Sequence, residues 1–112
     1  MAIDTVAVPT GTEETVVLSL GIGDLKAAAR VSIQLVNLTD SQTLTAYVYR
    51  KKYGMSAWAR SKIPDFEAIA PGLSEMTDVD VYDSDLIEVR AILDGVGGNV
   101  EVGTSFRKGQ RT

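Results

Sequence analysis

Cysteine and histidine are both absent from this chain of 112 residues. Without cysteine there can be no disulfide bridge, thiolate metal site or cysteine nucleophile. Without histidine the chain lacks the commonest general base, the commonest metal ligand and the usual partner of a catalytic serine. The glycine-rich stretches GIGD and GVGG do not match the phosphate-binding G-x-x-x-x-G-K pattern. We therefore expect no catalytic residues, no cofactor and no metal, and a function in binding instead of catalysis.

Long apolar runs and an excess of positive charge are missing as well. No stretch approaches the roughly 20 apolar residues of a membrane-spanning helix. The first residues, MAIDTVAVPTG, lack the basic start and apolar segment of a signal peptide. A formal net charge of −4 gives no general attraction to nucleic acid or to an anionic membrane. We expect a protein made in the cytosol of its producing cell, with neither nucleic acid nor membrane as a partner.

What the chain does contain is an ordinary globular composition, with 45% hydrophobic and 23% charged residues. This composition and length suit one domain with one hydrophobic core. We expect residues 1–112 to form that domain, with residues 1–10 and 107–112 as candidate extended arms. A terminal segment such as Met1 to Pro9 could also add a strand to the sheet of a neighbouring molecule.

Apolar and polar residues alternate along most of the chain with a period of two, which is typical of half-buried strands. The stretch VSIQL, residues 31–35, is one example, because its apolar residues fall on one side and Ser32 and Gln34 on the other. The apolar residues that share a face in the six alternating segments are Val16, Leu18 and Leu20; Val31, Ile33 and Leu35; Leu44, Ala46 and Val48; Val79 and Val81; Ile87, Val89, Ala91 and Leu93; and Val100 and Val102.

Turn sequences separate these segments: PTGTE, GIGD, NLTDSQ, KYGM, APG and DGVGGN. Glycine supplies positive φ in turns, and Asn or Asp side chains bond to nearby backbone. Residues 31–51 read as two strands around a short polar turn, residues 24–28 as one helical turn, and residues 64–76 as a short extended piece followed by a Pro-Gly turn. The pattern predicts an all-β fold: a single-domain antiparallel β-sandwich, jelly-roll or immunoglobulin-like, with about seven or eight strands in two facing sheets.

Four segments follow one another along the chain: Asn37 to Tyr49, Pro71-Gly72, Asp85 to Ala91 and Asn99 to Val102. Their order resembles that of the small β-sandwich structural proteins of tailed bacteriophages, which include capsid decoration (cement) proteins and accessory proteins of the neck and tail. The resemblance implies a virion protein on the capsid surface. It would bind across joints of the shell of the major capsid protein and stabilise the shell, together with copies of itself, for which we expect a trimer. The alternatives are a carbohydrate-binding or adhesion module, and a component of the phage neck or tail.

Aromatic and basic residues gather between residues 47 and 62. Two tyrosines at positions 47 and 49 stand on one face of a strand, and tyrosine, tryptophan and arginine are enriched in protein interfaces. Three interpretations of the basic run RKKYGMSAWARSK stay open: a solvated hairpin tip, a protein interface, and a site for single-stranded nucleic acid. Trp58 either points outward or fills the core. The candidate interface residues are Tyr47, Tyr49, Arg50, Lys52, Tyr53, Trp58 and Arg60.

An acidic run follows, TDVDVYDSD, which contains Asp78, Asp80, Asp83 and Asp85. Calcium sites need several oxygen ligands that converge from a loop, and the spacing here does not match an EF-hand. A solvated strand face that ends in an Asx turn explains the run better than an ion site does.

Overall fold

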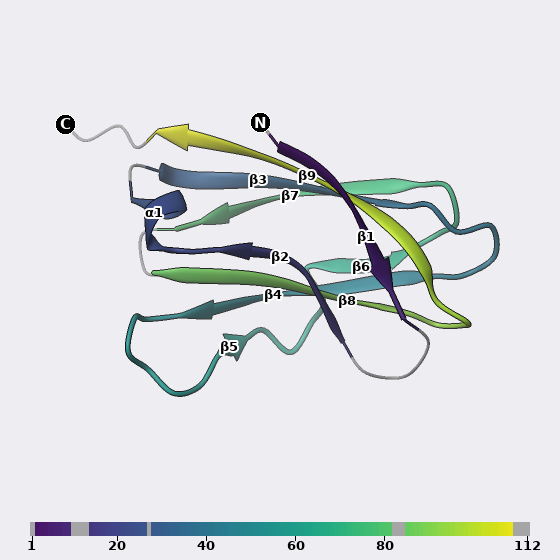
Figure 1. Ribbon diagram of the computed structural model, residues 1–112, viewed down its shortest axis with the longest axis horizontal. Coiled ribbons are helices and arrows are strands. Elements are labelled where there is room, and N and C mark those ends of the chain that lie inside the picture. Colours follow the sequence, from purple (N-terminus) through teal and green to yellow (C-terminus); the bar gives the residue numbers. More distant parts are fainter. Residues whose placement is uncertain (1, 10–13, 27, 82–84, 109–112) are drawn as a thin grey trace.

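The computed structural model describes residues 2–9, 14–26, 28–81 and 85–108. These residues form a sandwich of two antiparallel sheets that measures 47 × 29 × 22 Å (Figure 1). The predicted all-β, single-domain sandwich is confirmed. The described part has nine strands, against the seven or eight predicted. The strands at residues 2–8 and 59–60 lie outside the alternating segments identified in the sequence.

Sheet A has the strand order β1-β9-β3-β7. Its strands are β1 (Ala2–Val8), β9 (Gly98–Lys108), β3 (Ala28–Asn37) and β7 (Ser74–Asp80). Sheet B has the order β2-β8-β4-β5, and β6 also pairs with β4. Its strands are β2 (Thr15–Leu20), β8 (Leu86–Leu93), β4 (Leu44–Lys51), β5 (Ala59–Arg60) and β6 (Phe66–Ile69). The single turn of helix, α1 (Ile22–Leu25), begins two residues before the predicted turn, and Ala28 already belongs to β3.

The pairing of the strands is nested. β1 pairs with β9, β2 with β8, β3 with β7, and β4 with both β5 and β6. The chain is thus one long hairpin whose two arms are wound together, and the winding adds the pairs β3–β9 and β4–β8. This topology is that of a jelly roll, one of the two architectures predicted from the sequence.

The core lies between the inner faces of the two sheets, and it follows the predicted alternation in all but one strand. The predicted inward residues of β3, β4, β8 and β9 are buried, as are Val79 and Val81. In β2 the prediction is wrong for Val16, which is 44% exposed. A β-bulge between Val16 and Leu18 shifts the register by one residue, so that Val17 is buried in place of Val16. Such a bulge leaves no mark in a simple alternation of residue types.

The segment from residue 31 to residue 51 also departs from the prediction. β3 lies in sheet A and β4 in sheet B, so the polar stretch NLTDSQ crosses between the sheets and does not close a hairpin. Alternation shows that both strands have one buried face, but it does not say whether the two strands pair with each other. The predicted Pro-Gly turn is present after β6, where Gly72 has a φ of 78°.

A buried asparagine holds this crossover. Asn37 is fully buried, and its Nδ2 donates to the backbone oxygens of Gln42 at 2.6 Å and Ile69 at 2.9 Å. Its Oδ1 accepts from the backbone N–H of Thr39 at 3.0 Å. Gln42 then donates through Nε2 to the backbone oxygen of Gly97 at 2.7 Å. One polar side chain therefore ties together the crossover loop, the end of β6 and, through Gln42, the β8–β9 turn.

The substitution Asn37→Ala should lower the free energy of unfolding by about 2 to 4 kcal/mol, because it removes both hydrogen bonds from Nδ2 to buried carbonyl groups and leaves a cavity in their place. Chemical denaturation monitored by circular dichroism measures the change. Asp40→Ala, in an exposed position of the same loop, is the control and should change the stability by less than about 0.5 kcal/mol. Equal effects of the two substitutions would contradict this role of Asn37.

Candidate interaction surface on sheet B

The outer face of sheet B is formed by cross-strand rows of side chains. In one row, Ser19 of β2, Glu88 of β8, Tyr49 of β4 and Arg60 of β5 stand opposite one another in register. In the next row, Val16, Arg90 and Tyr47 do so. Strand alternation places these side chains on the face away from the core, because Val48 between the two tyrosines is fully buried.

The two arginines on this face reach diagonally across the rows. Arg90 stands opposite Tyr47, but its guanidinium carbon lies 3.9 Å from the ring centre of Tyr49. Arg60 stands opposite Tyr49, but its guanidinium carbon lies 4.1 Å from the ring centre of Tyr47. Diagonal neighbours in an antiparallel sheet are within reach of long side chains. Each tyrosine ring is therefore covered by the arginine of the other row.

Trp58 extends this stack. Its ring centre is 5.2 Å from Nζ of Lys51 and 5.6 Å from the guanidinium carbon of Arg90. Trp58 is half-buried and does not belong to the core cluster, so of the two orientations that the sequence left open, the outward one is observed. We call this group of alternating rings and cations the sheet B array; it consists of Tyr47, Tyr49, Lys51, Trp58, Arg60 and Arg90.

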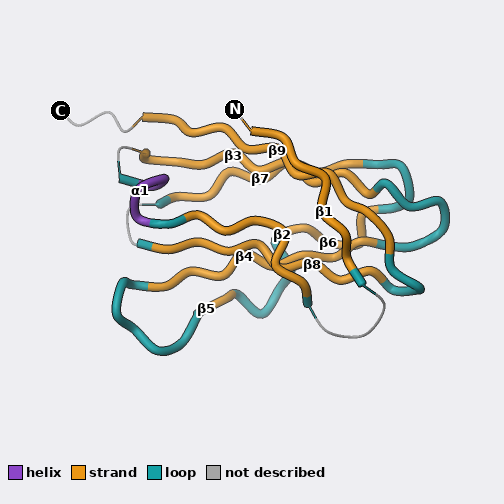
Figure 2. The backbone as a smooth tube through the Cα atoms, in the orientation of Figure 1, coloured by secondary structure: helices purple, strands orange, loops and turns teal. Residues whose placement is uncertain are grey.

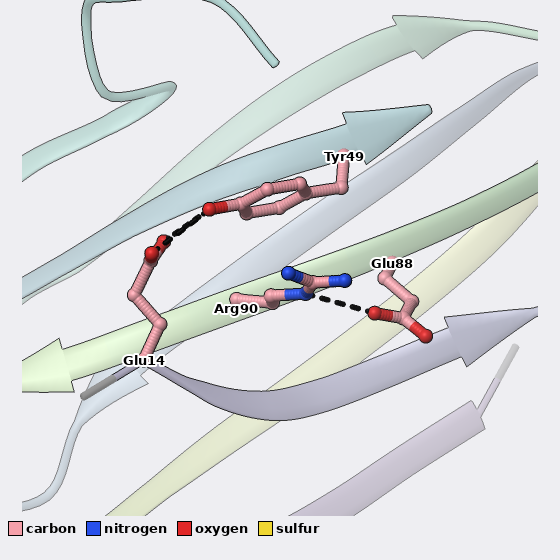
Figure 3. Close-up of polar contacts among 4 residues, drawn as sticks. All are labelled: Glu14, Tyr49, Glu88 and Arg90. Atoms are coloured by element: carbon pink, nitrogen blue, oxygen red, sulfur yellow. Dashed lines mark hydrogen bonds and ion pairs between the residues drawn. The ribbon is translucent and has the colours of Figure 1, made fainter. Parts of the chain in front are cut away.

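Two carboxylates fix the centre of the array (Figure 3). The hydroxyl of Tyr49 donates to the carboxylate of Glu14, whose two oxygens both lie 2.8 Å away. Nε of Arg90 donates to Oε1 of Glu88 at 2.9 Å, and their side chains are only 25% and 18% exposed. Burial raises the pKa of Tyr49 above its ordinary 10.0, and the hydrogen bond and charge of Glu14 raise the pKa further, against an opposing effect of Arg60 and Arg90.

The loop between β4 and β5 projects from one corner of the sandwich (Figure 2). It is anchored at its base by Asp85, whose Oδ2 accepts from the backbone N–H of Tyr53 at 2.9 Å and whose own N–H donates to the backbone oxygen of Lys51. A turn closes its tip, with a hydrogen bond from the N–H of Met55 to the oxygen of Lys52 and a φ of 85° at Gly54. The side chain of Tyr53 is 73% exposed and that of Met55 59%. An anchored loop thus presents apolar side chains to the solvent.

The predicted interface residues fall into three groups. Tyr47, Tyr49, Trp58 and Arg60 come together in the array, and Lys52 and Tyr53 are exposed on the adjoining loop. Arg50 stands apart, because it pairs in register with Ile87 and so belongs to the face opposite that of Tyr49. Four further members of this surface were not among the predicted interface residues: Glu14, Lys51, Glu88 and Arg90. Alternation had marked residues 88 and 90 as outward, but it gave no sign that β8 pairs with β4.

The composition of this surface suits contact with a protein better than stacking of a free ring. A sugar or a base stacks on an uncovered aromatic face, whereas each ring of the array has a cation of its own within 6 Å. Tyrosine, tryptophan and arginine are the residues most enriched at interface hot spots. Because their side chains are already held in place, less conformational entropy is lost on binding.

The acidic run behaves as a solvated face where it is described. Asp78 and Asp80 are exposed on β7, and Asp80 accepts from Arg30 at 3.1 Å in an exposed ion pair. Asp85 anchors the β4–β5 loop through its hydrogen bond to the backbone N–H of Tyr53. Asp83 lies outside the described residues. Within the described ranges no group of three or more acidic side chains is placed to hold a metal ion.

A shallow hollow lies on the outer face of sheet A. Its volume is about 110 Å³, with Ile3 and Met76 on opposite sides of Gly103 and with Gln34 and two serines between them. The hollow is smaller than the roughly 300 Å³ at which ligand pockets begin, and the side chains around it are uncharged.

Comparison of the chain with models of protein families, with curated protein sequences and with solved structures finds no match. Among the helices of the described residues, none has the length and apolar character needed to cross a membrane.

Loss of the Tyr49 hydroxyl should have a pH-dependent effect on stability. Because folding raises the pKa of Tyr49 above 10.0, the contribution of the neutral phenol is fully present below about pH 10 and is lost as the pH rises through the higher pKa of the folded state. Tyr49→Phe should lower the free energy of unfolding by about 1 kcal/mol near neutral pH, and this difference should shrink in strong alkali. Urea denaturation over a series of pH values measures both effects.

Tyr53→Phe is the matched control, since the side chain of Tyr53 is 73% exposed and lies outside the array. Its stability near neutral pH should equal that of the wild type. A Tyr49→Phe difference that is absent, or that stays constant into strong alkali, would contradict the proposed bond to Glu14.

Proposed function

We propose that this protein is a non-enzymatic structural protein of a phage particle, a decoration protein that binds across joints of the major capsid protein shell and stabilises it. The observation that carries the proposal is the sheet B array together with its loop, a preformed surface of tyrosine, tryptophan and arginine side chains on a rigid sheet. The resemblance of the four sequence segments to phage β-sandwich proteins supplies the identity of the partner.

The architecture supports the same proposal. Jelly rolls occur among viral capsid and lectin domains, although a fold by itself does not determine function. The lectin alternative needs an aromatic face open to a sugar, and the rings of the array are covered by their own cations. A protein surface, in contrast, can contact the array and the exposed loop residues Tyr53 and Met55 at once.

The proposed mechanism is adhesion by many copies. A shell offers the same joint repeatedly, so that modest contacts at each site add up over the particle. The basic residues of the loop and array, such as Lys52 and Arg60, would meet acidic groups at the rim of the contact and speed the association. The protein would then be located on the capsid surface, after synthesis in the host cytoplasm.

The proposal is tested by adding the purified protein to particles of its phage that lack it. We expect saturable binding with a fixed number of copies per shell and a higher temperature of shell disruption, measured by gel densitometry and by dye access to the packaged DNA. The double substitution Lys52→Ala/Tyr53→Ala should weaken binding about tenfold or more, because it removes side chains of the hot-spot type from an exposed loop.

Met76→Ala is the matched control, because it truncates an exposed side chain, 63% accessible, on the opposite sheet. It should leave shell binding unchanged. Absence of binding by the wild-type protein, or equal loss in both variants, would overturn the proposal. Specific binding on a glycan array would favour the carbohydrate-binding alternative.

A further inference from the structure

A sandwich of two open sheets has four edges, and an unprotected edge strand is a template for another strand. In sheet B, the β2 edge is interrupted by the bulge between Val16 and Leu18. The other edge of sheet B is divided between the short strands β5 and β6. In the gap between them, Oδ2 of Asp65 accepts the backbone N–H of Val48 at 2.8 Å, in the place of a paired strand. Both edges of sheet B thus carry recognised devices against strand addition.

In sheet A, the edge strand β7 has exposed acidic side chains at Glu75, Asp78 and Asp80. Like charges on such a strand oppose pairing with a second copy of itself. The fourth edge, β1, has neither kind of protection. All seven of its residues pair with β9 in an unbroken register, and Asp4 is its only charged residue. Ile3, Asp4 and Thr5 are exposed, with Ile3 at 62%.

We propose that β1 pairs with β1 of a second copy of this chain, antiparallel and about a two-fold axis, so that the two A sheets join into one continuous sheet. The register follows from full overlap of the seven-residue strands. Thr5 then stands opposite Thr5 of the second copy, Asp4 opposite Val6, and Ile3 opposite Ala7.

Self-complementarity favours a second copy over another partner. In this register Asp4 of each strand stands directly opposite Val6 of the other, so no like charges are directly opposite, and the two Asp4 residues are diagonal neighbours about 7 to 8 Å apart. Strand alternation places Ile3, Thr5 and Ala7 on the outer face of β1 in each copy. In the pair, the rows of the two copies therefore lie side by side on the same face of the joined sheet. Backbone groups on the outer side of β1 gain partners at the same time.

Such a contact is isologous and closes at two copies. The proposed oligomer is therefore a dimer, in place of the trimer that we expected from the sequence. The inference rests on the strand edges alone and does not depend on the proposed role in a phage particle, since dimerisation and shell binding are measured separately.

Thr5→Lys tests the contact without weakening the fold. Thr5 stands opposite Glu101 of β9 within the same chain, so the new lysine gains an acidic cross-strand neighbour. Across the two-fold axis, however, it places two lysines face to face. Sedimentation should show that the 12.0 kDa wild-type chain forms a concentration-dependent dimer, and that Thr5→Lys raises the dissociation constant about tenfold.

Ser19→Lys is the matched control. Ser19 is an exposed residue of edge strand β2 and stands opposite Glu88, so that the same kind of lysine meets the same kind of neighbour on a different edge. It should dimerise as the wild type does. Thermal unfolding of both variants checks that the fold is retained.

Cysteine substitution gives a second measurement in a chain without cysteine. Thr5→Cys should form a disulfide-linked dimer quickly under mild oxidation, because residues directly opposite in an antiparallel pair have Cα atoms about 4.5 to 5.5 Å apart, within the range for a disulfide. Ser19→Cys should cross-link much more slowly. A wild-type chain that is monomeric or trimeric at all concentrations, equal effects of the two lysines, or equal cross-linking of the two cysteines would overturn the proposal.

Discussion

Burial of every second side chain between two sheets is the constraint on which the other features depend. It fills the space between the sheets with aliphatic residues, and the buried polar side chains in the described part of the chain are those of Asn37, Gln42 and Thr104. Asn37 and Gln42 bond to backbone at one end of the sandwich and so serve its construction. Interaction with other molecules is therefore left to the outer faces, the loops and the strand edges.

The sheet B array shows how an outer face becomes ordered without a core above it. A single exposed cation–π contact is worth only about 0.5 to 1 kcal/mol. Here Arg90 contacts Tyr49 and Trp58 and also bonds to Glu88, so each contact restricts a side chain that makes another. The result is a surface that is held in its conformation before a partner arrives, which reduces the entropic cost of binding. A protein that must attach at many equivalent places gains from such a surface, because the saving recurs at every site.

Much of the fold could be predicted from the sequence, because a strand with one buried face alternates apolar and polar residues. The all-β sandwich, the inward residues of β3, β4, β8 and β9, and the outward positions of Tyr47 and Tyr49 all follow from alternation. Alternation does not encode which strands are neighbours. For this reason the crossing of β3 and β4 into different sheets, the bulge beside Val16 and the recruitment of Arg90 from β8 were missed. In the array, Tyr47, Tyr49, Trp58 and Arg60 were predicted from the sequence, and Lys51 and Arg90 were not.

The most direct test of this account is the nuclear magnetic resonance signature of the Arg90 side chain. If its guanidinium lies 3.9 Å from the ring centre of Tyr49 and bonds to Glu88, its side-chain protons should be shifted upfield by the ring, and its Nε–H should exchange slowly with water. Replacement of Tyr49 by leucine should abolish the upfield shift. Arg90 signals at the positions of an unfolded peptide, with fast exchange in the intact protein, would contradict a preformed array.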